Sequence, residues 1–160
     1  MKDFKIWKTI ELGTHKNIND LETAIQKSKM IIGSWAKDVL YSKEFILSNN
    51  KTSLDLFRIT PKELGYPTGV TTEVIYNKIF DFGLSLCPLE VGPQLRLQYK
   101  NQPLLESLQI GMRQQEDTKG YKSEFRVVHA VDGKLWLAGD HKHKDNFWDP
   151  DEYFIFCKKI

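Results

Sequence analysis

The sequence predicts one soluble α+β domain, residues 1–160, in which a helical N-terminal half packs on a C-terminal antiparallel sheet. The first observation is the length, because 160 residues suit a single domain with its own core. The second is a change of hydrophobic period, from helical spacing before residue 83 to alternation after residue 95. The third is the pair Asp132-Gly133, which is typical of a tight hairpin turn.

The composition is that of a folded globular protein, with 41% hydrophobic and 12% aromatic residues. A formal net charge of +2 is too small to indicate nucleic acid or an anionic membrane as the partner. No apolar run approaches the roughly 20 residues of a membrane span. Cys87 and Cys157 are far apart in sequence, so neither a disulfide framework nor a zinc ribbon is indicated. We therefore expect a cytoplasmic protein without membrane association.

The N-terminal half contains signals for a strand followed by two helices. Alternating apolar residues predict a strand from Phe4 to Leu12. Asn19 and Glu22 have the spacing of a capping box, which predicts the start of a helix. Ser34 predicts the cap of a second, short helix.

Two further elements are expected before residue 84. Residues 54–59 predict a short strand, which ends at the turn Thr60-Pro61-Lys62-Glu63. A helix then runs from a cap at Thr71 to a stop at Gly83, because glycine tolerates the left-handed conformation that ends helices. The apolar stripe of this helix consists of Val70, Val74, Ile75, Ile79 and Phe82.

Alternation in the second half predicts the strands of the sheet. Two of them are marked by Leu95, Leu97 and Tyr99, and by Leu108, Ile110 and Met112. A last strand, YFIFC, follows the loop at Asp149, Pro150 and Asp151.

A two-residue loop at Asp132-Gly133 sets the expected register of the hairpin, with Ala130 opposite Leu135 and His129 opposite Trp136. One face of this hairpin is apolar and suits the core. It consists of Val128, Ala130, Leu135 and Leu137. The other, more aromatic face consists of Phe125, Val127, His129 and Trp136.

The segment from Phe82 to Pro103, FGLSLCPLEVGPQLRLQYKNQP, is the main candidate for a binding site. Its prolines indicate extended and turned chain, which is typical of a structural connector. The alternative is a recognition surface, in which Arg96 binds a carboxylate or phosphate and Tyr99 stacks on a ligand. The candidate ligand-binding residues are Glu90, Gln94, Arg96, Gln98, Tyr99 and Gln102, together with Trp136 of the hairpin.

Two histidines are candidates for a general base. In a small hydrolase or ribonuclease-like enzyme, His129 or His141 would move a proton and Arg96 would bind the oxyanion or phosphate. The spacing of His141 and His143 also suits a metal ion, but the flanking lysines repel a cation. Neither a metal nor a cofactor is predicted, and no nucleophile elbow or glycine-rich nucleotide loop occurs in the sequence.

The abundance of aromatic residues leads to a third hypothesis, single-stranded nucleic-acid binding. An aromatic sheet face near Arg96, Arg113 and Arg126 would stack unpaired bases. No RNP-like pattern accompanies these residues, and packing of the aromatic residues in the core is the alternative.

Two stretches resemble a known group of sequences. LGYPTGVTTEVIYNKIFDFGLSLCPLEVGPQLRLQYKNQP and NFWDPDEYFIF are similar to a family of small uncharacterised bacterial proteins, for which LCPxEVGPQLRLQYxxQP is a distinctive segment. The resemblance spans most of the chain and implies a free-standing domain, without implying any activity. We therefore expect a binding or accessory protein that recognises a partner or small ligand through residues 90–102 and the aromatic hairpin face. The enzyme and the nucleic-acid binder are the alternatives.

Overall fold

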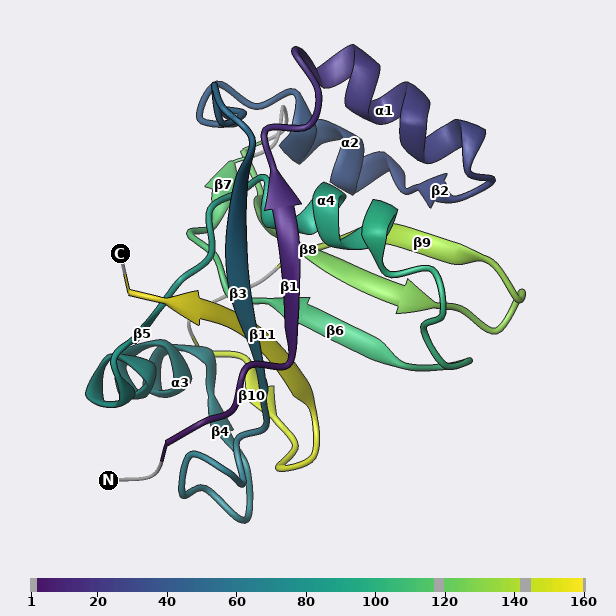
Figure 1. The fold of residues 1–160 in the computed structure, drawn as a ribbon. Helices are drawn as coiled ribbons and strands as arrows, with labels where there is room; N and C mark the ends of the chain where they lie inside the picture. The colour runs from purple at the N-terminus through teal and green to yellow at the C-terminus, as the bar shows by residue number, and fades with distance from the viewer. Residues whose placement is uncertain (1–2, 117–119, 142–144, 160) are drawn as a thin grey trace.

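The computed structural model describes residues 3–116, 120–141 and 145–159, which form a curled mixed sheet with helices on both faces (Figure 1). The strand order is β1-β3-β11-β6-β8-β9-β2, with β5 paired to β11 and β7 paired to β8, while β4 and β10 form a separate ribbon. The strands are β1 (Lys8–Leu12), β2 (Ile31–Ile32), β3 (Thr52–Ile59), β4 (Val70–Thr71), β5 (Leu84–Ser85), β6 (Ser107–Ile110), β7 (Gln115–Glu116), β8 (Lys122–His129), β9 (Leu135–His141), β10 (Phe147–Trp148) and β11 (Tyr153–Lys158). The helices are α1 (Ile18–Lys27), α2 (Ser34–Leu40), α3 (Thr72–Lys78), the 3₁₀ helix η1 (Ile79–Phe82) and α4 (Val91–Gln98).

The sheet is mixed, so the α+β class is confirmed but the expected antiparallel sheet is wrong. β11 pairs antiparallel with β3 and parallel with β6, and β2 pairs parallel with β9. The division into a helical half and a sheet half is also wrong, because β1 and β3 belong to the sheet and α4 lies in the second half. The physical reason is that the last strand inserts between strands from both halves. Such long-range pairing leaves no trace in local periodicity.

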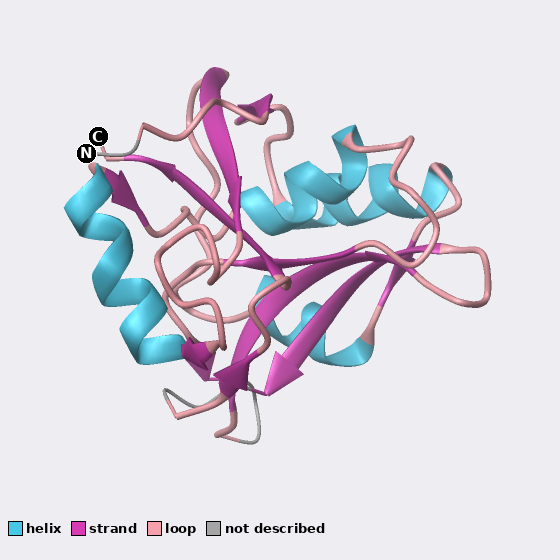
Figure 2. Ribbon diagram, turned by 90° about the horizontal axis from the view of Figure 1, so that it is seen from below, coloured by secondary structure: helices cyan, strands magenta, loops and turns pink. Residues whose placement is uncertain are grey.

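Two buried clusters lie on opposite faces of the sheet, as the side chains of β11 show. Ile155 and Cys157 belong to the larger cluster, which also contains buried residues of α2, α4 and β8. Phe154 and Phe156 belong to the smaller cluster, which contains residues of α3 and η1. Alternate side chains of a strand point to opposite faces, so β11 is covered on both sides. Figure 2 shows helices on either side of the strands.

The helix boundaries are confirmed at α3 and shifted at α1. Thr71 is the N-cap of α3, and Gly83 ends η1 with a φ of +72°, where glycine avoids the cost of a side chain. The cap of α1 is Asn17 rather than Asn19, because the Asn17 side chain accepts a 2.8 Å hydrogen bond from the amide of Asp20.

Smaller differences concern single positions. β1 begins at Lys8 rather than at Phe4, although β3 and β11 lie where expected. α2 starts at Ser34, but its N-cap is Gly33. Val74 of the expected apolar stripe is exposed on α3.

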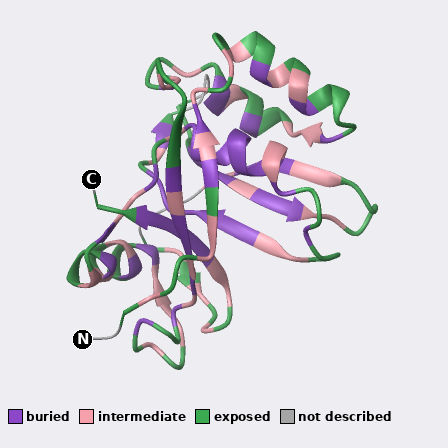
Figure 3. Cartoon of the chain, viewed as in Figure 1, coloured by how far each residue is buried: buried purple, intermediate pink, exposed green. Residues whose placement is uncertain are grey.

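Residues 91–98 form helix α4 rather than the expected strand. The amide of Gln94 donates to the carbonyl of Glu90 at 3.1 Å, and the amide of Tyr99 donates to the carbonyl of Leu95 at 2.8 Å. Pro93 is tolerated because it lies in the first turn, where no intrahelical donor is needed. Figure 3 shows that most of α4 is buried, next to α1 and β1.

The β8–β9 hairpin is shifted by one residue from the expected register. The amide of Ala130 donates to the carbonyl of Lys134, and Gly133 adopts a φ of +78°, which closes a longer loop than a two-residue turn. His129 therefore pairs with Leu135, and Val128 pairs with Trp136. The shift exchanges the core face and the outer face of β8. Phe125 and Val127, expected outside, are buried in the larger cluster together with Leu137. Val128, expected in the core, lies on the opposite face together with Trp136.

Candidate functional site

Three of the predicted site residues form a polar ladder along one side of α4: Glu90 and Gln94, which are buried, and Gln98, which is partly buried. The carboxylate of Glu90 accepts hydrogen bonds from the amides of Gly13 and Ser48 at 2.7 and 2.8 Å. Gln94 donates to Glu90 at 2.9 Å, and Gln98 donates to the side-chain oxygen of Gln94 at 2.9 Å. The ladder thus joins two loops to the helix.

The amide of Gln98 also pairs with the backbone of β1. Its Oε1 accepts from the amide of Glu11 at 2.9 Å, and its Nε2 donates to the carbonyl of the same residue at 2.8 Å. One side chain therefore satisfies both backbone groups of a strand residue.

Arg96 and Gln102 join α4 to the hairpin on the other side. Arg96 is 0% exposed, and its guanidinium donates to Gln102 Oε1 at 2.7 Å and to the carbonyl of Tyr99 at 2.6 Å. It also donates to the carbonyls of Val128 and Trp136, both at 3.3 Å. Burial lowers the pKa of Arg96 to about 10, so the group remains charged at neutral pH.

The expectation that residues 90–102 point outward is therefore wrong. Glu90, Gln94, Arg96, Tyr99 and Gln102 are all buried, and each has partners within the chain. Buried polar groups must be hydrogen-bonded to be tolerated, and here the bonds connect a helix to backbone groups of two loops and three strands. These residues therefore hold α4 against the loops and strands around it.

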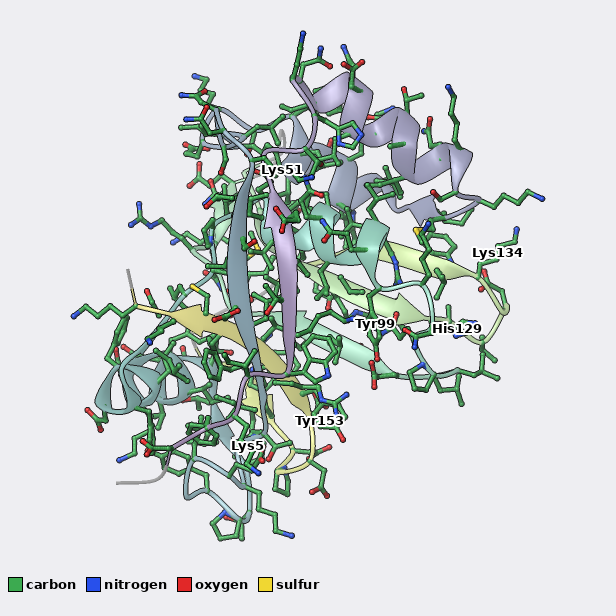
Figure 4. The ribbon with its side chains drawn as sticks, viewed as in Figure 1. Lys5, Lys51, Tyr99, His129, Lys134 and Tyr153 are labelled. Carbon is green, nitrogen blue, oxygen red and sulfur yellow. The ribbon has the colours of Figure 1, made fainter. Side chains whose placement is uncertain are left out.

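A cluster of rings and cations lies where Tyr99 emerges from α4. The Tyr99 hydroxyl donates to Glu106 at 2.9 Å, and Arg58 pairs with the other oxygen of that carboxylate at 3.1 Å. The Arg58 guanidinium lies 5.2 Å from the ring of Trp7 and 4.6 Å from the ring of Tyr153. Figure 4 labels Tyr99 and Tyr153.

The candidate bases are held by contacts within the chain. His129 lies near the end of the hairpin together with Lys134 (Figure 4), and both of its ring nitrogens face backbone carbonyls. Nδ1 is 2.8 Å from the oxygen of Gln102, and Nε2 is 3.2 Å from that of Gly133. His141 lies between two rings, stacked on Trp35 at 3.8 Å and on Tyr121 at 4.8 Å.

An open groove, here called the outer groove, lies over the outer face of β8 and β9. Its volume is about 510 Å³. Its apolar lining includes Trp35, Leu105, Val128, Val131, Trp136 and Ala138, and its polar lining includes Ser107, Arg126 and His129. Trp136, the seventh predicted binding residue, is the one that lies on this face of the hairpin.

Trp35 reaches the outer groove because α2 packs closely on β9. The amide of Gly33 donates to the carbonyl of Leu137 at 2.9 Å, which fixes the start of α2 against the strand. A Cβ on Gly139 would lie 2.7 Å from the backbone nitrogen of Ala36, so glycine is needed for this contact. The result is an indole that is 45% exposed at the edge of the groove.

Two other lining residues are held in specific conformations. The indole nitrogen of Trp136 donates to both carboxylate oxygens of Asp132, at 3.3 and 3.1 Å, so the polar edge of the ring is already satisfied. Leu105 has a φ of +70° and is 64% exposed. A left-handed leucine is strained, and such strain is concentrated at functional positions.

An adjoining cavity of about 480 Å³, here called the acidic end, continues the outer groove. The two share Leu105, Ser107 and Arg126. Arg126 pairs with Asp140 at 3.0 Å. The acidic end is lined by four carboxylates, those of Glu106, Asp140, Asp151 and Glu152. Among the described residues that line this cavity, the carboxylates outnumber the guanidinium groups even when Arg58, the partner of Glu106, is counted.

The described residues contain neither a group of metal ligands nor a membrane-spanning helix. Within residues 3–116, 120–141 and 145–159, no three His, Cys, Asp or Glu side chains are arranged to hold a metal ion. His143, considered with His141 for a metal, lies outside that part of the chain. Of the helices in those ranges, none is both long enough and apolar enough to span a membrane.

Comparison with known proteins identified no matching family model, no matching curated protein and no matching solved structure. Membership in the bacterial family that the sequence resembles therefore stays a prediction.

Several residues of the outer groove had no recognisable signal in the sequence. Trp35 and Leu105 come from elements far from the hairpin, and only the tertiary structure brings them to Trp136. The ion pair of Arg126 and Asp140 follows from the register, because Arg126 pairs with Ala138 and Glu124 with Asp140. Under the expected register, Arg126 would share the face of Val128, which the sequence analysis assigned to the core.

Proposed function

We propose that the protein is a non-enzymatic binding protein whose outer groove accepts an extended polypeptide segment carrying an apolar side chain next to a basic one. The observation that carries the proposal is the joining of an apolar cavity to an acidic one on one sheet face. Trp35 and Trp136 offer rings to an apolar or cationic side chain, and the carboxylates of the acidic end attract a Lys or Arg.

The enzyme alternative has less support. Arg96 is buried against four oxygen acceptors, and a clamp for an oxyanion or phosphate must face the reacting group. The ring nitrogens of His129 are directed at backbone carbonyls rather than at a substrate space.

The nucleic-acid alternative is opposed by charge. Phosphate contacts dominate nucleic-acid affinity, and they require Lys or Arg along the binding surface. Among the described residues that line the outer groove and the acidic end, Arg126 is the one such residue, and Asp140 already pairs with it.

The test is a titration of the full-length ¹⁵N-labelled protein with a short capped peptide of alternating leucine and lysine. We expect amide shifts on β8 and β9 and at the Trp136 indole. Three probes are matched to it: one with glutamate for lysine, one with glycine for leucine, and an oligothymidylate. The first two are expected to bind at least tenfold more weakly, which corresponds to about 1.4 kcal/mol.

Variants assign the binding to this surface. Trp136→Ala and Asp140→Asn are each expected to lower the affinity for the leucine-lysine peptide at least tenfold. Phe80→Ala is the matched control, because Phe80 is an exposed aromatic residue that lines a different cavity. Equal binding of the glutamate peptide would refute the proposal, and salt-sensitive binding of the oligothymidylate at the same strands would favour the nucleic-acid alternative.

A further inference from the structure

The fold brings together the two cysteines, which are distant in sequence. β5 pairs with β11 so that Ser85 is opposite Cys157, and Cys87 follows two residues after Ser85. The amide of Cys87 donates to the carbonyl of Gly111 at 2.7 Å, which fixes this chain next to the central sheet. Cys87 and Cys157 are therefore diagonal neighbours across an antiparallel pair of strands.

Each thiol contacts the backbone of the segment that carries the other thiol. Cys87 Sγ is 3.5 Å from the carbonyl oxygen of Ile155, and Cys157 Sγ is 3.4 Å from that of Leu86. The two side chains also interact, because each shifts the pKa of the other. Both residues belong to the buried core, with 5% and 2% of their surface exposed.

Both thiols also line a cavity of about 570 Å³ on the surface of the molecule. The charged residues around this cavity are mostly basic, with Arg113, Lys158 and Lys159 against Glu44. Positive charge favours a thiolate over a thiol, and the cavity gives a small reagent a route to the sulfur atoms.

We propose that Cys87 and Cys157 form a redox site in which a small hydroperoxide converts the two thiols into an intramolecular disulfide. The Cys157 thiolate attacks the terminal peroxide oxygen, the O–O bond breaks, and the leaving oxygen departs as water or an alcohol after protonation. Cys87 then attacks the sulfenic sulfur of Cys157, the S–O bond breaks, and the hydroxyl leaves as water with the proton of the Cys87 thiol. The thiol pair loses two electrons and two protons, and the hydroperoxide is reduced.

The order of the two sulfurs follows from their surroundings. The interaction with Cys87 lowers the pKa of the Cys157 thiol, while burial raises the pKa of the Cys87 thiol well above its usual range. We assign Cys157 as the first nucleophile and Cys87 as the resolving thiol, because the pKa of Cys157 is lowered and the cavity-lining Lys158 follows it directly in β11. This site is independent of the outer groove, because the two cavities share no residue.

The experiment treats the full-length protein with hydrogen peroxide and then alkylates the denatured chain. We expect the wild type to lose both alkylatable thiols, to lose the mass of two hydrogens, and to yield a peptide in which Cys87 is linked to Cys157. Cys87→Ser should instead accumulate a sulfenic acid on Cys157 that dimedone traps. Cys157→Ser should react at least tenfold more slowly, since it lacks the first nucleophile.

The wild-type measurement decides the matter even if a serine variant fails to fold. Retention of both thiols at a peroxide concentration that oxidises the same chain in denaturant, or oxidation of Cys157→Ser as fast as Cys87→Ser, would overturn the proposal. A mass gain without a linked peptide would also overturn it. Arg113→Gln provides a control for the cavity charge, and we expect slower oxidation with the same final disulfide.

Discussion

At the scale of single residues, Arg96 decides how α4 meets the hairpin. A charged group is costly to bury, and the cost is offset only when its donors are matched by acceptors of good geometry. Here the acceptors are the side-chain oxygen of Gln102 and three backbone carbonyls, including those of Val128 and Trp136 on adjacent strands. The guanidinium therefore connects the interior helix with the strands that form the floor of the outer groove.

Replacement of Arg96 by methionine is expected to destabilise the protein by about 3 kcal/mol or more, because it leaves buried acceptors without donors. Urea unfolding monitored by circular dichroism measures the change. Arg113→Met is the control, since Arg113 is exposed and a surface substitution costs about 0.5 kcal/mol or less. An equal, small effect of both substitutions would contradict the structural role assigned to Arg96.

Tyr99 gives the molecule a defined response to alkali. Burial, followed by the hydrogen bond to Glu106, raises the pKa of Tyr99 from 10.0 to about 12. The folded protein therefore keeps the proton over a pH range in which the unfolded chain loses it. The stability that this proton contributes is complete below pH 10 and is lost as the pH rises toward 12.

Tyr99→Phe removes the titrating hydroxyl and with it this pH-dependent contribution to the free energy of unfolding. The variant is therefore expected to lose less stability than the wild type between pH 10 and pH 12. The comparison is made by urea unfolding at both ends of this interval. Tyr76 is common to both proteins and cancels in the difference, whereas Arg96 interacts with Tyr99, so its titration also differs between the two proteins. Parallel pH profiles of the two proteins would show that Tyr99 is not shielded in the folded state.

At the scale of elements, α4 shows why the sequence was misleading. The run from Leu95 to Tyr99 alternates apolar and polar residues, as a half-buried strand does. The helix is favoured by polar side chains spaced four residues apart, which lie along one side and form hydrogen bonds with one another. They are Glu90, Gln94 and Gln98. That spacing was the signal that could have identified the helix.

Close packing of α4 on β8 provides a test at this scale. A Cβ added to Gly92 would lie 2.4 Å from the ring of Phe125, so Gly92→Ala is expected to cost about 1–3 kcal/mol through overpacking. Gly33→Ala is the matched control, because its Cβ meets its nearest neighbour at an ordinary 3.6 Å. Calorimetric melting of both variants measures the difference. A Gly92→Ala protein as stable as Gly33→Ala would place the helix farther from the strand.

Local signals predicted the elements better than they predicted the pairings. The cap at Thr71 and the stop at Gly83 identified α3, and the apolar run YFIFC identified β11. The hairpin register depended on whether Gly133 closes a two-residue or a longer loop, and both loops use the same Asp-Gly pair. Of the residues that line the outer groove, the sequence analysis named Trp136, His129 and Arg126, whereas Trp35 of α2 and Leu105 reach the groove only through the tertiary structure.

At the scale of the whole molecule, the central position of β11 makes the fold dependent on this strand. This last strand pairs with β3, β5 and β6, and it contributes buried side chains to both main clusters. Phe154, Ile155 and Phe156 are each worth about 1.5–3 kcal/mol of burial. Their sum is comparable with the entire stability of a typical domain, about 5–15 kcal/mol.

A chain that ends at Glu152 is therefore expected not to fold, although it retains all the helices. The measurement is amide dispersion in a ¹⁵N NMR spectrum, together with a urea titration that should show no cooperative transition. Full-length Phe147→Ala serves as the control, because Phe147 is exposed and its loss should leave the spectrum dispersed. Native-like dispersion in the shortened chain would mean that the remaining strands form a sheet without β11.

The bonds between Gln98 and Glu11 have a consequence for how the molecule behaves among its own copies. β1 is the outermost strand at one end of the sheet order, and an uncovered strand of this kind is a template on which another chain can add by backbone pairing. The carboxamide of Gln98 already occupies the donor and acceptor that such a chain would use at Glu11. A partly buried side chain of α4 thereby protects a crowded solution of this protein from edge-to-edge aggregation.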